Sequence, residues 1–194
     1  MSDPEGYWEV QMVGVGGQGL ALAGLILAEA AGIHEGWHVA MTESHGVNVR
    51  GGPSRAEVII SRQEIDYPCV RRPHILVAFT EKDAQRLGPL LRQEGILIAD
   101  STIPQLPDLP GRAVSLPLTQ LAQELGDVVV AGIVALAAMT DLTGVVSWGT
   151  LEAAVLARVP PRAKDMNLRA LEAGRRAAAE GAPLEGQARR RADE

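Results

Sequence analysis

The sequence has one cysteine, Cys69, among 194 residues, so the chain cannot form an internal disulfide. It also cannot ligate an iron–sulfur cluster or a cysteine-rich zinc ion by itself, because these sites need several thiolates. The four histidines are scattered along the chain without the spacing of a metal site: His34, His38, His45 and His74. We therefore expect no metal on this chain, and a lone thiol is typical of the reducing cytoplasm.

Aromatic residues and long apolar runs are also scarce. Three Trp, two Tyr and one Phe leave the core to aliphatic side chains. The longest apolar run, residues 128–139, is too short to span a bilayer, and the acidic, polar start does not resemble a signal peptide. The net charge of −6 disfavours general nucleic-acid binding. These features predict a cytoplasmic protein without membrane or nucleic-acid partners.

Hydrophobic periodicity at the start of the chain predicts a strand over residues 7–15, a glycine turn, and a largely buried helix over 20–31 that Gly32 ends. Further strands are predicted over 37–44 and 55–61. The segment between them is short, rich in glycine and without a helical pattern, whereas a parallel crossover needs a dozen or more residues. We therefore expect these two strands to be antiparallel.

The rest of the chain continues this pattern and then turns helical. By the same criteria, strands are predicted over 75–79, 96–99 and 113–116 (the last at an edge), and helices over 81–93, 119–126, 127–141, 147–159 and 164–180. Thr80, Asp127 and Ser147 are the predicted N-terminal caps of three of these helices. The fold class is thus α/β: a single domain over residues 1–180 with three α/β/α layers, a mixed, mainly parallel sheet, a Rossmann-like start and a helical C-terminal part. A disordered tail is expected over 181–194.

Gly14, Gly16 and Gly19 form a G-x-G-x-x-G motif between a strand and a helix. Such a turn leaves free N–H groups at the helix start, which favour an anion. One interpretation is NAD or FAD binding, with Glu43 as the ribose-binding acid. The antiparallel return after the second strand argues against it, since it leaves the nucleotide-binding half incomplete. In another interpretation the turn merely packs the helix on the strand.

The loop over residues 43–55 is the second informative segment, because it carries two arginines, a histidine and three glycines. This composition suits an anion or a partner's main chain. We hypothesise that the glycine turn and this loop form one concave face at the carboxyl ends of their strands. The predicted ligand- or partner-binding residues are Gly14, Gly16, Gly17, Gln18, Gly19, Ser44, His45, Gly46, Arg50, Gly51 and Gly52. His45 also has a simpler interpretation as an ordinary exposed histidine.

Three segments together resemble a known family. They are Gly14 to Gly19, then Arg50-Gly-Gly-Pro-Ser54 before Ala56-Glu-Val58, and Ile65-Asp-Tyr-Pro68. At this spacing they resemble the gamma subunits of 2-oxoacid:ferredoxin oxidoreductases, with a likeness that extends over about residues 8–175. The segment at 65–68 is most similar to the 2-oxoglutarate type.

The resemblance implies a complex that oxidatively decarboxylates a 2-oxoacid with coenzyme A to acyl-CoA and CO2 and reduces ferredoxin. The favoured substrate is 2-oxoglutarate, ahead of pyruvate and other 2-oxoacids. Thiamine diphosphate, magnesium and iron–sulfur clusters are expected on partner subunits and no cofactor on this chain. The partners implied are alpha and beta subunits, with a ferredoxin-like delta subunit as a further candidate.

Within such a complex the chain has no catalytic residue of its own, and in isolation it should be inactive. Its role would be assembly and a share in a coenzyme A or substrate pocket. We expect the isolated chain to form a homodimer through apolar helices left without partners. Two other classes stay open on the residues alone: a free-standing NAD- or FAD-binding oxidoreductase, and a purely structural interaction module.

Overall fold

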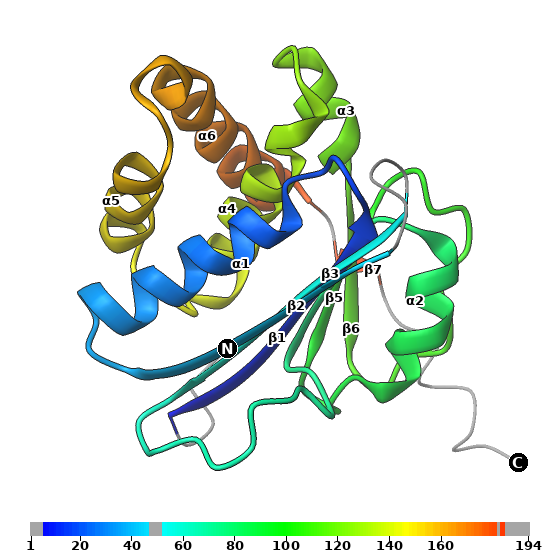
Figure 1. The fold of residues 1–194 in the computed structure, drawn as a ribbon. Coiled ribbons are helices and arrows are strands. Elements are labelled where there is room, and N and C mark those ends of the chain that lie inside the picture. The colour runs from blue at the N-terminus through cyan, green and yellow to red at the C-terminus, as the bar shows by residue number, and fades with distance from the viewer. Residues whose placement is uncertain (1–5, 47–51, 182, 185–194) are drawn as a thin grey trace, which may run out of the picture.

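The computed structural model describes residues 6–46, 52–181 and 183–184, which form a seven-stranded sheet flanked by helices (Figure 1). Arg50, Gly51 and the predicted tail apart from Gly181, Pro183 and Leu184 lie outside the described residues. The strands are β1 Tyr7–Val15, β2 His38–His45, β3 Pro53–Ser61, β4 Ile75–Ala78, β5 Ile96–Asp100, β6 Arg112–Leu116 and β7 Pro183–Leu184.

The sheet has the order β2-β3-β1-β4-β5-β6-β7. β1, β4, β5 and β6 pair in parallel, β3 lies antiparallel between β1 and β2, and β7 pairs antiparallel with β6. β2 thus points the same way as β1, and only β3 and β7 run against the others. The predicted mixed, mainly parallel sheet and the antiparallel return from β2 to β3 are confirmed.

The helices follow the predicted N-terminal caps closely. Their bounds are α1 Leu20–Glu29, α2 Glu81–Leu87, α3 Leu118–Glu124, α4 Ala131–Thr143, α5 Trp148–Arg158 and α6 Lys164–Glu180. The side chains of Thr80, Asp127 and Ser147 each accept a backbone N–H at the start of α2, of the 3-10 turn before α4, and of α5. Each cap satisfies one of the N–H groups that a helix start leaves unpaired.

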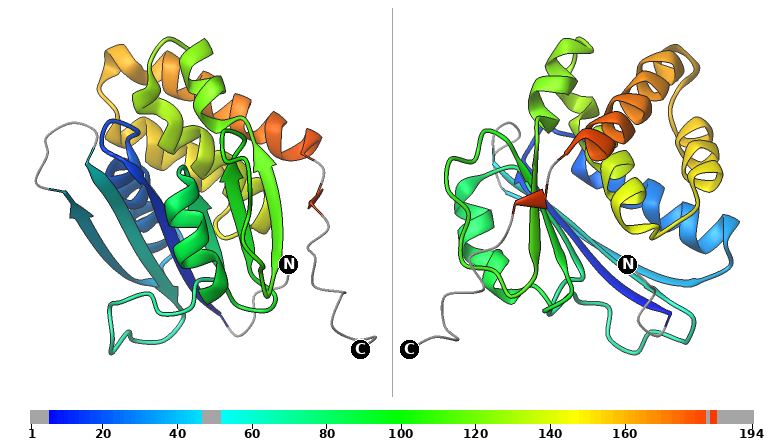
Figure 2. Two further views of the ribbon diagram at one scale, coloured as in Figure 1. Left: turned by 90° about the vertical axis from the view of Figure 1, so that its right-hand side faces the viewer. Right: turned by 180° about the vertical axis from the view of Figure 1, so that it is seen from behind.

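The helices cover the two faces of the sheet unequally (Figures 1 and 2). α2 packs on one face, whereas α1 and α4 pack on the other, with α5 and α6 outside them. α4 is apolar around its whole circumference because it is buried between the sheet and α6. Its apolar surface is therefore unavailable to the homodimer contact that we predicted through apolar helices.

Two predicted boundaries and one predicted strand position are wrong. The first helix does not stop at Gly32 but continues as a π-helical turn over Ala30–His34, and the positive φ of a terminating glycine occurs at Gly36. α2 ends at Leu87, because Pro89 cannot donate the next helical hydrogen bond. β6 is not an edge strand, since β7 pairs with it.

Candidate functional site

The glycine turn connects the buried end of β1 to the first residue of α1. Gly17 and Gly19 have φ of 104° and 72°, values that residues with a side chain rarely adopt. The first hydrogen bond at the start of α1 runs from the Ala23 N–H to the Gly19 oxygen, at 2.9 Å. The N–H groups of residues 20–22 precede that bond, and the start of the helix carries no acidic residue that would repel an anion.

Two of the residues that we predicted as ligand or partner contacts, Gln18 and Gly14, are buried inside the turn. Gln18 is buried, and its side-chain oxygen accepts the Val15 N–H at 2.9 Å. The Gln18 main-chain oxygen accepts the Gly132 N–H of α4 at 2.8 Å. Gly14 is buried too, and a Cβ there would overlap the Gln18 side chain. The need to satisfy buried polar groups of the turn therefore turns Gln18 inward.

The second loop meets the glycine turn at its two described ends. The Gly16 N–H donates to the Gly52 oxygen at 2.8 Å, and the Gly46 N–H donates to the Pro53 oxygen at 2.8 Å. Between the two segments lies a hollow of about 400 Å³. Its wall consists of Gly16, Gly17, Gly19, Leu20, Ala21, Leu22, His45, Gly46, Gly52, Pro53, Ser54 and Val129.

Six of the eleven predicted site residues therefore line one hollow: Gly16, Gly17, Gly19, His45, Gly46 and Gly52. Ser44 is exposed on β2 opposite Arg55 and is not part of the wall. The sequence analysis missed the first turn of α1, the start of β3 and Val129. The first two had a signal in the sequence, because α1 follows the turn directly and the start of β3 ends the second loop, whereas Val129 is distant from both segments in the sequence.

The hollow combines two kinds of surface. The start of α1 offers backbone N–H groups and the positive end of a helix dipole, which attract an anion. Leu22 and Val129 contribute apolar surface beside it, and Val129 is 43% exposed. His45 lies 3.7 Å from the carboxylate of Glu43 at the rim. The arrangement suits a ligand or segment that carries both an anionic group and an apolar portion.

The position of Glu43 argues against a dinucleotide. In a Rossmann fold the ribose-binding acid ends the strand next to β1. Here β3 separates β2 from β1, which places the end of β2 about 10 Å from that of β1 at the usual strand spacing. Glu43 therefore does not occupy the position of a ribose-binding acid.

Within residues 6–46, 52–181 and 183–184, no three His, Cys, Asp or Glu side chains are grouped so that they could hold a metal ion. Over the same ranges no helix has the length and apolar character needed to cross a bilayer. Cys69 is exposed and unpaired.

Comparison with known proteins gives concordant matches. The family described as pyruvate ferredoxin/flavodoxin oxidoreductase matches residues 9–177. The 2-oxoglutarate synthase subunit KorC of Methanothermobacter thermautotrophicus is 40% identical over 181 residues, 89% of this chain and 96% of its own. The gamma subunit of a keto/oxoacid ferredoxin oxidoreductase from Geobacter sulfurreducens has a TM-score of 0.81 at 37% identity, over 90% of this chain and 98% of its own. The pyruvate oxidoreductase subunit PORC from Thermotoga maritima has a TM-score of 0.77 at 25% identity, over 93% of this chain and 100% of its own.

Proposed function

Since the chain belongs to the pyruvate ferredoxin/flavodoxin oxidoreductase family, as a gamma subunit of the 2-oxoglutarate type, we propose that its hollow contributes to the coenzyme A pocket of the assembled enzyme. The reaction of that complex is the oxidative decarboxylation of 2-oxoglutarate, with transfer of the acyl group to coenzyme A and of electrons to ferredoxin. The chain acts as an assembly subunit that adds a binding surface to the complex.

The observation that carries this proposal is the shared hollow of the glycine turn and the second loop. Coenzyme A has anionic phosphates and a less polar pantetheine arm. The N–H groups at the start of α1 suit a phosphate, and Leu22 and Val129 suit the arm. Arg50 lies outside the described residues but is close in sequence to Gly52, which lines the hollow, and a guanidinium there would add charge-assisted hydrogen bonds.

The single cysteine supports placing the redox cofactors elsewhere in the complex. An iron–sulfur cluster needs several ligating thiolates, and one thiol cannot provide them. We therefore propose that thiamine diphosphate, magnesium and the clusters reside on alpha, beta and delta-type partner subunits. On this proposal the isolated chain has no turnover.

The test is the Michaelis constant for coenzyme A in a complex reconstituted from full-length subunits. A Val129→Glu substitution places a carboxylate at the wall of the hollow and should raise this KM about tenfold, the cost of one unfavourable charged contact. Val129→Gln is the matched neutral control and should change it little. Arg50→Ala should raise the same constant and leave the KM for 2-oxoglutarate unchanged.

Exposed arginines elsewhere provide a second control. Arg162 is exposed in the 3-10 turn before α6 and does not line the hollow, so Arg162→Ala should leave both constants unchanged. If Val129→Glu and Arg50→Ala both keep the wild-type KM for coenzyme A, the coenzyme A proposal is wrong, and the hollow is then a contact for a partner segment.

A further inference from the structure

The loop between β3 and β4, residues 62–74, takes no part in the hollow although it contains the Ile65–Pro68 segment. It has no helix or strand, and most of its residues are exposed. It lies at the amino end of β4, whereas the glycine turn lies at the carboxyl end of β1, so the two surfaces are at opposite ends of the sheet. Long loops that are ordered on a rigid scaffold commonly carry binding functions.

The end of this loop is fixed by a buried carboxylate. Glu9 of β1 is 6% exposed, and its Oε2 accepts the backbone N–H groups of Arg71 at 3.0 Å and Arg72 at 2.8 Å. The Glu9 N–H donates to Nδ1 of His74 at 2.9 Å, and Nε of Arg92 donates to the Arg72 oxygen at 3.0 Å. These bonds order the backbone of the loop without using the side chains of Arg71 and Arg72.

Donor groups converge on a hollow of about 440 Å³ beside this anchor. Its wall consists of Arg72, His74, Arg92, Gln93 and Glu94. The guanidinium of Arg72 suits carboxylate oxygens, and so does that of Arg92, which also lies 3.7 Å from the carboxylate of Glu9. The presence of Glu94 favours one or two carboxylates over a long polyanion.

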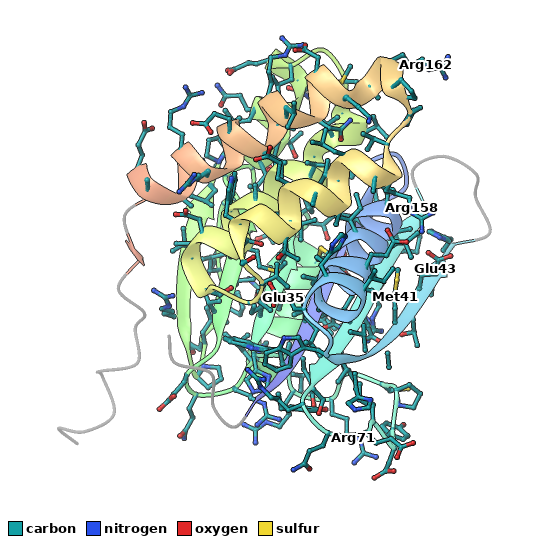
Figure 3. All side chains as sticks on the ribbon, turned by 90° about the vertical axis from the view of Figure 1, so that its left-hand side faces the viewer. Glu35, Met41, Glu43, Arg71, Arg158 and Arg162 are labelled. Carbon is teal, nitrogen blue, oxygen red and sulfur yellow. The ribbon has the colours of Figure 1, made fainter. Side chains whose placement is uncertain are left out.

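An aromatic side chain extends this surface. The Arg71 guanidinium lies 4.4 Å from the ring centroid of Tyr67, and Tyr67 is 53% exposed (Arg71 is labelled in Figure 3). Among the residues that the structure describes, no carboxylate lies within 4.0 Å of the guanidinium of Arg71 or Arg72. Exposed Tyr and Arg side chains on an ordered backbone are the residues that dominate protein interfaces.

We propose that this surface, made of Tyr67, Arg71, Arg72 and Arg92, docks an acidic loop of a partner subunit of the same complex. One or two carboxylates of that loop bind Arg72 and Arg92, and an apolar side chain packs on Tyr67. The proposal rests on the chain being an assembly subunit, as argued above, but not on coenzyme A binding. Charge complementarity selects the partner, since this chain has a net charge of −6 and yet presents Arg71 and Arg72 here without a carboxylate within 4.0 Å among the described residues.

The experiment measures binding of the full-length chain to the co-purified catalytic subunits by biolayer interferometry, without coenzyme A. Arg72→Glu and Tyr67→Ala should each weaken binding about 30-fold, as expected of interface hot spots. Added NaCl should weaken wild-type binding and affect Arg72→Glu less. Arg72→Gln serves as a second variant, because it removes the charge without placing a carboxylate near Glu9, and circular dichroism establishes that each variant is folded.

Arg162→Glu is the matched control, because it makes the same charge change on an exposed arginine at the other end of the molecule (Figure 3). It should bind within twofold of wild type. Wild-type affinity in folded Arg72→Glu, Arg72→Gln and Tyr67→Ala would refute the proposal. It would also be refuted if these variants lost only self-association of the chain. At saturating subunit concentrations, Arg72→Glu should keep the wild-type KM for coenzyme A, which separates this surface from the glycine-turn hollow.

Discussion

The contact between α4 and the glycine turn provides a sharp test of how the hollow is held in shape. A Cβ on Gly132 would lie 2.7 Å from the Gly19 oxygen and 3.0 Å from the Gln18 oxygen, both rigid backbone atoms. Ordinary contacts of a Cβ are 3.4–4 Å. In Gly132→Ala the turn must therefore move away from α4, which strains the hydrogen bond from the Gly132 N–H to the Gln18 oxygen.

The magnitude follows from opposing terms. Overpacking costs about 1–3 kcal/mol and a weakened buried hydrogen bond about 1 kcal/mol. The higher helix propensity of alanine offsets about 1 kcal/mol. The net loss is about 1–3 kcal/mol, which for a chain of this length lowers the midpoint of thermal unfolding by roughly 3–10 °C.

Differential scanning calorimetry of the full chain measures this change, and Gly149→Ala is the matched control. Gly149 is also helical, in α5, but a Cβ there has no atom within 4 Å. Its substitution should be neutral or stabilise the chain by about 0.5 kcal/mol. If Gly132→Ala unfolds at or above the wild-type temperature, the close approach of α4 does not hold the turn, and our account of the site is wrong.

Three further predictions concern single side chains. Thr140 is buried and its hydroxyl has no hydrogen-bond partner among the described residues. Thr140→Val should therefore leave the free energy of unfolding unchanged or raise it by up to about 1 kcal/mol, as measured by thermal unfolding. A large loss of stability would show that the hydroxyl has a hydrogen-bond partner. Ser147→Ala removes the cap of α5 and should cost about 1 kcal/mol in urea unfolding, whereas Ser147→Asp should restore most of it. The pKa of Tyr7 is raised above 10.0, chiefly by burial and then by the charge of Glu9, so Tyr67→Phe should leave a phenolate transition above pH 10 in absorbance at 295 nm. Because the unfolded tyrosine ionises first, stability from Tyr7 is present below pH 10 and is lost as the pH rises above it; a transition at or below pH 10 would contradict this.

The elements that the sequence predicts well are those determined by local pattern. β1 and α6 have the predicted bounds, because the first alternates and then becomes continuously apolar and the second has an amphipathic repeat. Thr80, Asp127 and Ser147 could be identified as caps because a cap needs only its own side chain and the next few N–H groups. The antiparallel return to β3 was predictable from loop length alone.

The features that the sequence does not reveal depend on contacts between distant segments. The main-chain oxygen of Gln18 accepts a hydrogen bond from Gly132 of α4, and nothing near Gln18 in the sequence indicates that contact. Val129 enters the wall of the hollow for the same reason. The anchoring of residues 71–74 depends on Glu9, which looks like an ordinary strand residue until β1 and β4 pair.

The hydrogen bonds that close the glycine turn have a kinetic consequence. Gln18, Gly52 and Gly132 satisfy the backbone of the turn from inside the protein, so its shape does not depend on an incoming molecule. A ligand or partner segment that binds there loses little free energy to ordering the turn. Binding at this surface should therefore proceed in a single phase, and variants of the hollow should differ mainly in how fast they release what they hold.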